Sequence, residues 1–581
     1  MISRRTALAS GVRRILALVL ALAAVACARG GRETAARPAS VLLVTVDTLR
    51  ADRLGCYGDA QARTPAADGL ARAGVRFERA YTPAPLTLPA HASLMTGLLP
   101  PAHGVRANGG YALPAGPPTL AEALRARGLA TAAFVAAFPV ARRFGLHRGF
   151  DHYDDTLSRP GGVHYEFAER PATAVVQAAS DWLAAHAGPA FVWVHLFEPH
   201  APYDPPAAFR GPDPYRGEVA AADSALARLL AAWDARPDPS LVVLTADHGE
   251  AFGEHGEESH SLFVYDTTLH VPLVLRGAGV PAGARVAAPV SLSDVAATVL
   301  DAVGAPASMP GATLLPAARG GAAPAAPLYA ETLAPQLDFG WSPLFAWRDG
   351  SRKYIHAPRP ELYDLAADPA ETRNLAATRG AEAARLAAAL AAHRQRGSVE
   401  SRGPADVEAA ERLRALGYVQ GPGARGTGAD PKDKVEVARR IAGAAGPFAS
   451  HAAAAEAYAA LFALDPDVPV VNLRLADALL RSGRAAQAVP RYEQVIAAAP
   501  RTADAHVGLA TAYAELGRLE DAARVLRAAL AVDPDNGQVH YNLGEVARAK
   551  GDLVAARARY ERALGDPITE ERARQRLTSL H

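Results

Sequence analysis

The chain has 581 residues, more than one hydrophobic core usually holds, so we expect two or three domains. Half of its residues are apolar and 21% are charged, as in globular proteins. Lys and Arg (61) nearly balance Asp and Glu (60), and this lack of basic excess argues against a nucleic-acid partner. Two cysteines do not predict a disulfide framework.

Residues 1–27 have the pattern of a signal peptide. The apolar run 15–26 is too short to span a bilayer but suits the core of an export signal, and it follows four arginines, Arg4, Arg5, Arg13 and Arg14. The run ends in Ala24-Val25-Ala26-Cys27, which resembles a bacterial lipoprotein processing site. We therefore expect export to the periplasmic side or the cell surface, with a lipid on Cys27 as membrane anchor. The alternative is an ordinary secretory signal with a coincidental cysteine.

Apolar stretches alternate with helical ones between residues 40 and 376. The predicted strands are 41–47, 130–136, 191–197, 241–246 and 271–275, and helical stretches are predicted at 119–127, 172–186 and 218–235. This alternation predicts an α/β domain with a mostly parallel central sheet. Residues 377–440 are predicted to connect it to the next domain, through an alanine-rich helix at 381–396 and a flexible Gly-rich linker at 421–428.

Residues 441–581 carry a repeat of 34 residues. Pro466, Pro500 and Pro534 are spaced by this period, and so are three glycines, three alanines and three leucines: Gly483, Gly517, Gly551, Ala488, Ala522, Ala556, Leu475, Leu509 and Leu543. The period and its positions resemble the tetratricopeptide repeat, a pair of helices joined by a turn. Such all-α stacks present a concave surface, so we expect a protein partner there.

Three short segments carry side chains suited to chemistry. Two apolar runs stop at Asp47 and at Asp247-His248, and the carboxyl ends of parallel strands meet at one edge of a sheet, where ligands gather. Thr87 lies in a Pro-rich segment, predicted to be a turn, and could supply a hydroxyl nucleophile. Each segment alone also fits a cap or a turn, but the combination favours a site.

Longer motifs extend these segments. They are Asp47-Thr-Leu-Arg-Ala-Asp-Arg-Leu-Gly-Cys-Tyr-Gly58, Ala84-Pro-Leu-Thr-Leu-Pro-Ala-His-Ala-Ser-Leu-Met-Thr-Gly97, Asp247-His-Gly-Glu-Ala-Phe-Gly-Glu-His-Gly256 and the segment from Glu361 to Leu375. In this order they resemble the sulfatase family of the alkaline phosphatase superfamily, over residues 40–376. The resemblance implies an alkaline-phosphatase-like α/β sandwich that hydrolyses sulfo- or phospho-esters of small molecules.

The resemblance also implies a divalent metal, Zn²⁺, Mn²⁺ or Ca²⁺, since carboxylate oxygens and imidazole suit these ions. Its ligands would be Asp47, Asp247 and His248, with the nucleophile Thr87 facing it as a further ligand. Substrate oxygens would be held by residues that match the family's Asn, His and Lys; these are Asn108, His200 and His260, with His replacing Lys. His91 stands where a substrate-binding Arg is usual. A second metal at Glu198, His200 and His260 is a further expectation.

The sequence departs from sulfatases proper at two further positions. Thr87 replaces the Cys or Ser that becomes formylglycine, and Thr48 replaces a second acid. Threonine nucleophiles resemble those of the phosphodiesterase and phosphoethanolamine-transferase branches. A threonine ester cannot collapse to an aldehyde, so water or an alcohol must attack its central atom, and we expect phosphate esters or phosphonates to be preferred over sulfate esters. The alternatives are a phosphotransferase and an inactive domain in a repeat-containing scaffold.

Overall fold

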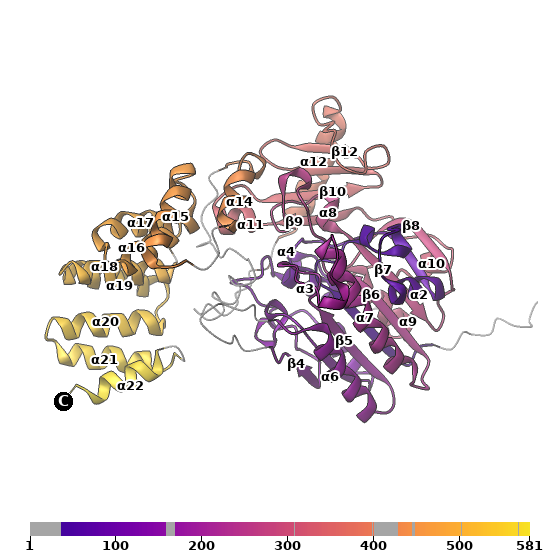
Figure 1. Cartoon of the computed structure of the whole chain (residues 1–581), viewed down its shortest axis with the longest axis horizontal. Coiled ribbons are helices and arrows are strands. Elements are labelled where there is room, and N and C mark those ends of the chain that lie inside the picture. Colours follow the sequence, from indigo (N-terminus) through magenta and orange to yellow (C-terminus); the bar gives the residue numbers. More distant parts are fainter. Residues whose placement is uncertain are drawn as a thin grey trace, which may run out of the picture.

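The computed structural model describes residues 37–157, 169–306, 308–397, 399, 428–443, 448–500, 502–566 and 569–580 (Figure 1). The predicted signal peptide with Cys27 and nearly all of the predicted Gly-rich linker lie outside the described residues. Within the described ranges, no helix is both long and apolar enough to cross a membrane.

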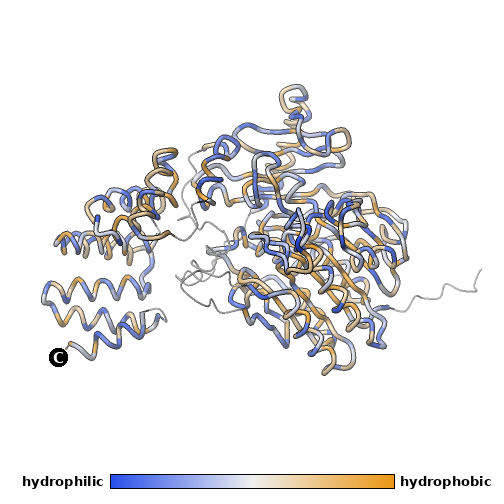
Figure 2. Tube along the Cα trace, in the orientation of Figure 1, coloured by the Kyte–Doolittle hydropathy of each residue, from blue (hydrophilic) through white to orange (hydrophobic). Residues whose placement is uncertain are grey.

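Eight of the described strands form one sheet, in the order β4-β3-β5-β1-β6-β7-β2-β8. Their bounds are β1 Ser40–Val46, β2 Val75–Tyr81, β3 Ala130–Phe134, β4 His152–Asp154, β5 Ala190–Leu196, β6 Ser240–Ala246, β7 His270–Gly277 and β8 Ala284–Ser291. Strand β7 is antiparallel to both neighbours and the other pairs are parallel, which confirms the predicted mostly parallel sheet. The central strands β5, β1 and β6 are buried along almost their whole length, which explains their continuous apolar runs (Figure 2).

Helices cover both faces of this sheet (Figure 1). On one side α2 (Pro65–Ala73) and α6 (Ala172–Ala185) pack against the long helix α7 (Pro214–Asp234). The other side carries α3 (Thr87–Thr96), α5 (Leu120–Arg125) and α9 (Asp294–Ala302), which contact one another. Short helices complete the layers: α4 (Pro100–His103), α8 (Asp266–Leu269) and α10 (Leu315–Ala318). The predicted strands and helices of this region are confirmed, whereas β2, β4 and β8 were not predicted.

A second, antiparallel sheet follows, in the order β12-β11-β10-β9. Its strands are β9 Leu328–Thr332, β10 Leu344–Asp349, β11 Arg352–His356 and β12 Glu361–Asp364. Helix α12 (Gly380–Arg394) confirms the predicted alanine-rich helix, but it does not merely connect domains. Its Leu386 and Leu390 are buried in a cluster with side chains of this sheet. The first part of the predicted connector therefore belongs to the core of the small sheet.

The C-terminal region is a stack of helix pairs, as the 34-residue period predicts. Its helices are α15 His451–Leu464, α16 Pro469–Arg481, α17 Ala485–Ala498, α18 Ala503–Glu515, α19 Leu519–Val532, α20 Gly537–Ala549, α21 Leu553–Ala563 and α22 Glu570–Thr578. The turns between paired helices contain Gly483, Gly517 and Gly551, each with φ between +73° and +81°, which only glycine adopts easily. The periodic alanines and leucines are all buried between the helices.

Helix α14 (Val435–Gly443) joins the repeats to the first domain. Its Ala438 and Ile441 share one apolar cluster with Phe339 and Trp341, which lie in and after α11 (Ala334–Phe339), and with α15 and α16. At its start, Val435 lies so close to Gly256 that a Cβ there would come within 2.8 Å of it. The predicted boundary at residue 440 thus falls inside a helix that packs against both parts of the chain.

We expect Ile441→Ala to loosen this junction. Ile441 is 6% exposed, and truncating a buried Ile costs about 2–5 kcal/mol. The variant should show a lower urea midpoint and faster proteolytic separation of the repeats from the first domain. Val554→Ala is the matched control because Val554 is 84% exposed on α21. Equal behaviour of the two variants would contradict this role for α14.

Candidate active site

The register of the central strands brings the predicted ligands together. Val46 at the end of β1 pairs with Ala246 at the end of β6, so Asp47 and Asp247 leave neighbouring strands side by side. The amide of Asp47 donates to the Leu196 carbonyl at the end of β5 (2.9 Å), which extends the ladder to the edge of the site. The backbone hydrogen bonds of the sheet therefore fix the spacing of the two carboxylates.

Three buried ligand atoms converge at this edge. His248 Nε2 lies 3.8 Å from Asp47 Oδ1 and 3.6 Å from Asp247 Oδ2, and one ligand atom from each of the three residues fits within a span of 4.8 Å. None of these three atoms has a hydrogen-bond partner, although buried polar atoms are normally paired. His248 Nδ1 bonds the Gly249 carbonyl (2.9 Å), which leaves Nε2 as the coordinating nitrogen. Two carboxylate oxygens and an imidazole nitrogen suit a divalent cation.

The pKa shifts of Asp47, Asp247 and His248 also favour a cation site. Burial raises the pKa of both carboxyl groups, and the charge of Asp47 raises the pKa of Asp247 further. Burial acts to lower the pKa of His248, but Asp247 and Asp47 outweigh it and the pKa is raised. Two buried carboxylates this close repel each other, and a bound cation would remove the repulsion.

Thr87 is the first residue of helix α3. The turn predicted here from the sequence is therefore wrong. Leu86 is extended and caps the helix, while Pro89 sits in the first turn, where a missing N–H costs nothing. The Thr87 side chain is buried, and its hydrogen bond to Asp47 acts to lower the pKa of that carboxyl group. The hydroxyl thus lies beside the ligand cluster, at the positive end of the helix dipole.

Asn108 is placed to hold an anion next to Thr87. Its Oδ1 accepts from the Leu88 amide (2.8 Å), which fixes the side chain against the first turn of α3. Its Nδ2 is buried and has no partner. An unpaired buried donor beside a nucleophile is a binding group for an incoming oxygen atom.

His200 and His260, together with Asn108, form what we call the polar wall of the site. Their ring centroids are 5.2 Å apart, and His260 lies 4.5 Å from the ring of His248. Burial lowers the pKa of His200 to about 4 and holds the pKa of His260 well below its usual value, which favours the neutral form of both rings. His200 Nδ1 is engaged by the Ala201 carbonyl (2.6 Å), so Nε2 is the nitrogen that can act on a substrate.

Glu250 belongs to the site but was not singled out from the sequence. It is fully buried, and its two oxygens contact His260 Nδ1 (2.9 Å) and the Tyr203 hydroxyl (3.0 Å). The carboxylate orients the His260 ring and favours a proton on its Nδ1. The only available signal was its place directly after Asp247-His248-Gly249.

His91 supports the site from inside the protein. Its Nδ1 bonds the Thr87 carbonyl (2.8 Å) and its Nε2 bonds the Thr45 hydroxyl (3.0 Å). Both ring nitrogens therefore tie the start of α3 to β1, and the substrate contact expected of His91 stays a prediction. His195 likewise contacts Asp47 Oδ2 (3.3 Å) from β5.

Glu198 does not join His200 and His260 in the expected second metal site. Its Oε1 accepts from the Ala172 amide at the start of α6 (2.9 Å), and its charge raises the pKa of Glu169. The metal-ligand groups found among the described residues are Asp47-Asp247-His248 and His91-His195-Asp247, and neither contains Glu198. Glu198 and His200, two residues apart in the loop after β5, thus contact different parts of the protein.

Thr48 fills the position of the missing second acid. It has a φ of +52°, unusual for a β-branched residue, and its amide donates to Asp247 Oδ1 (3.3 Å). Its hydroxyl is buried without a partner. The strained backbone is held by this contact and by the Tyr215 hydroxyl, which donates to the Thr48 carbonyl (2.8 Å).

Comparison with known proteins places this site in context. Residues 39–305 match the family model Sulfatase, and residues 473–526 and 509–571 match a tetratricopeptide repeat model. Steryl-sulfatase of Mus musculus is 40% identical over 108 residues, which cover 17% of this chain and 17% of that protein. The ulvan-active sulfatase of Formosa agariphila is 26% identical over 321 residues, 45% of this chain and 61% of its own length. The matches thus span less than two thirds of either relative.

A solved structure shares the fold. The phosphonate monoester hydrolase from Silicibacter pomeroyi superposes with a TM-score of 0.51 at 23% identity, covering 62% of this chain and 95% of that one.

We expect Asp247→Asn to weaken binding of Zn²⁺ or Mn²⁺ at least tenfold, because it removes one of the two charged ligands. Metal content after dialysis measures this. In the unmodified protein, a metal at 100 times its Kd should stabilise the fold by about 2.7 kcal/mol, seen as a rise in Tm that a chelator reverses. Asp52→Asn, which removes a surface carboxylate paired with Arg50, should keep the metal response. Unchanged metal binding by Asp247→Asn would refute the ligand assignment.

Proposed function

Residues 39–305 form a sulfatase-family domain, followed by tetratricopeptide repeats, and from this premise we propose that the protein is a metal-dependent ester hydrolase with Thr87 as its nucleophile. One observation carries the proposal. The buried Thr87 hydroxyl contacts Asp47 at the start of α3, beside three buried ligand atoms that lack any partner. This arrangement supports attack by an activated hydroxyl on a charged ester.

Substrate binding would use the polar wall around Thr87. Asn108 Nδ2 donates to one non-bridging oxygen, and the neutral His200 and His260 contact the others. The three side chains come from different segments and are each fixed by a hydrogen bond to the protein: Asn108 through Leu88, His200 through Ala201 and His260 through Glu250. The site is therefore preorganised around the transferring group before substrate arrives.

Activation of Thr87 would depend on its surroundings. The hydroxyl donates to the Asp47 carboxylate, which can take up its proton as the oxygen attacks the central atom of the ester. The bond from that atom to the organic oxygen breaks, and the alcohol leaves with a proton from solvent. A divalent metal bound at Asp47, Asp247 and His248 would lower the pKa of that hydroxyl and neutralise charge on the ester. The α3 N-terminus adds a favourable dipole for the oxygen that develops negative charge.

The chemistry of a threonine ester favours phosphorus over sulfur in the transferred group. The covalent ester on Thr87 must be cleaved by attack on its central atom, because threonine has no aldehyde hydrate through which to expel it. A phosphoryl ester on Thr87 carries two negative charges at neutral pH and a sulfate ester one, so the phosphoryl group gains more from neutralisation by the site. We therefore propose phosphate esters or phosphonates as preferred substrates, with sulfate esters as slower ones, although the curated relatives above are named as sulfatases.

We expect Thr87→Ala to abolish turnover of aryl phosphate, phosphodiester, phosphonate and sulfate esters while the protein keeps its metal, because the variant loses the attacking oxygen and not the three ligands. Values of kcat/KM for the metal-loaded enzyme on matched esters measure both the loss and the order of preference. Thr96→Ala is the control, since the Thr96 hydroxyl bonds only the Ala92 carbonyl (2.6 Å) and the Leu98 amide (3.2 Å), at the opposite end of the helix.

Four outcomes would overturn parts of this assignment. Retained activity in Thr87→Ala would exclude Thr87 as nucleophile, and a clear preference for the sulfate ester would reverse the proposed order. Transfer of the group to added alcohols faster than to water would identify a phosphotransferase. A metal-loaded protein inactive on every ester would identify a scaffold.

We further propose that the chain is exported and held in a membrane by a lipid on Cys27. The basic and then apolar N-terminal segment that ends at this cysteine supports the proposal. Cys27→Ala should move the protein from the membrane fraction to the soluble fraction of cells that express the full chain. Mass spectrometry that finds an unmodified Cys27 in the mature protein would refute it.

A further inference from the structure

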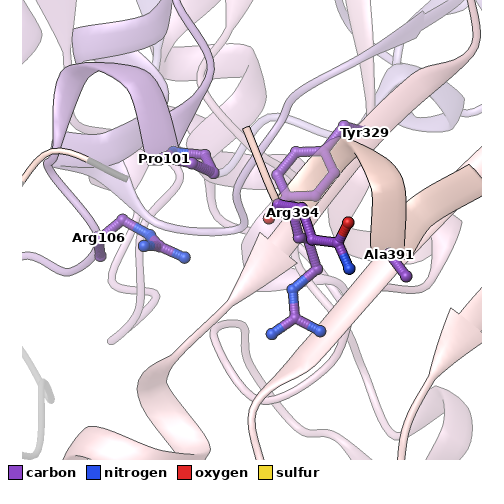
Figure 3. Close-up of a pocket in the computed structure, with 6 residues that line it drawn as sticks. Pro101, Arg106, Tyr329, Ala391 and Arg394 are labelled. Carbon is purple, nitrogen blue, oxygen red and sulfur yellow. The ribbon is translucent and has the colours of Figure 1, made fainter. Parts of the chain in front are cut away.

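A cavity of about 400 Å³ lies where the first domain meets the small sheet. It is lined by Pro101, Arg106, Tyr329, Ala391, Arg394 and Gln395. Arg106 comes from the segment after α4, Tyr329 from β9 and the last three residues from the end of α12 (Figure 3). Two arginines, an amide and an aromatic ring therefore face one space.

The charges around this cavity do not cancel. Arg106 forms a bidentate pair with the buried Glu331 through Nε and Nη2, and the Tyr329 hydroxyl also donates to Glu331. Glu331 thus neutralises Arg106 and has its lone pairs occupied. Arg394 has no carboxylate partner among the described residues, and its guanidinium lies 3.6 Å from the centre of the Phe345 ring. One positive charge and the Gln395 amide remain available to a ligand.

The cavity is close to the catalytic groups. Arg106 is two residues from Asn108, so their Cα atoms are within about 7 Å of each other. On the other wall, the amide of Glu331 donates to the carbonyl of Pro83 (3.0 Å), four residues before Thr87. The next residue, Thr332, donates to the carbonyl of Ser261, next to His260. A substrate held at Asn108 and His260 can therefore extend toward Arg394.

We propose that this cavity binds a second anionic group on the organic part of the substrate, a sulfate, phosphate or carboxylate separate from the scissile ester. Guanidinium groups bind such planar or tetrahedral anions with two charge-assisted hydrogen bonds. The Tyr329 ring and Pro101 supply apolar contact for the part of the substrate between the two anions. This assignment rests on the proposed function, since it names the class of substrate for the same site.

The test compares two disaccharide phosphonate monoesters that are identical except for one additional sulfate group on the neighbouring sugar, so that they carry one and two negative charges. The wild-type enzyme should show a kcat/KM about tenfold higher for the dianionic compound, through a lower KM. Arg394→Gln should remove this advantage and leave the monoanionic compound unaffected, because the lost charge contacts only the second anion. The advantage should also shrink as salt is raised.

Arg385→Gln is the matched control, because it removes the same charge from α12 nine residues away, about 13 Å along the helix, from an exposed pair with Asp349. It should keep the advantage. Equal kcat/KM for the two compounds in the wild-type enzyme, or an equal loss in both arginine variants, would overturn the proposal.

A binding measurement separates this proposal from the proposed hydrolysis. In the Thr87→Ala background, calorimetry with the dianionic compound should show about tenfold weaker binding when Arg394→Gln is added. If the wild-type enzyme turns over neither compound, the hydrolase assignment fails while this difference in affinity still supports the cavity. Inorganic sulfate that weakens binding of both compounds equally would place the free anion at Asn108 and contradict a second anion site at Arg394.

Discussion

Two carboxylates held side by side in a buried place are the constraint on which the site depends. Parallel pairing of β1 with β6 places Asp47 and Asp247 directly after neighbouring strand ends before any ligand binds, and their backbones cannot separate without breaking the sheet. Their repulsion raises the free energy of the folded protein without a cation, so the rest of the fold must offset this repulsion. His248 and the Thr87 hydroxyl offset only part of it, because ligand atoms of the cluster remain unpaired. A site of this kind gains its full stability from a cation and an anionic substrate together.

The position of Thr87 is set by a chain of buried hydrogen bonds. The Thr45 hydroxyl on β1 contacts His91 Nε2 and the Trp193 indole nitrogen, each at 3.0 Å, and His91 Nδ1 holds the Thr87 carbonyl. The first turn of α3 is thereby fastened to the same strand that ends at Asp47. Burial lowers the pKa of His91 to about 4, so this link stays neutral and adds no charge to the cluster. The distance between Thr87, the proposed nucleophile, and the proposed metal ligands is thus determined by the core and not by a loop.

The sequence predicted the parts of the fold whose signal is strong and local. β1, β5 and β6 are continuous apolar runs, and the 34-residue period predicts the repeats. Thr87 was predicted to lie in a turn because its segment is rich in proline, although proline is well tolerated in the first turn of a helix. The small sheet was missed because its strands are short and its core is completed by a helix, α12. Site residues are also hard to predict when only tertiary contacts decide their role. Glu198 and Glu250 both lie beside predicted site residues, but only Glu250 contacts His260.

The repeats are coupled to the catalytic domain through the segment that carries His260. Residues 254–262 pack against α14 at Gly256 and Leu262, and Ser261 is held by Thr332 from β9. The neutral His260 is therefore positioned by Glu250 on one side and by a backbone that rests on the repeat junction on the other. Val435 and Ile441 of α14 thus link the repeats by direct packing to the segment that carries this histidine, whose ring lies 4.5 Å from that of His248.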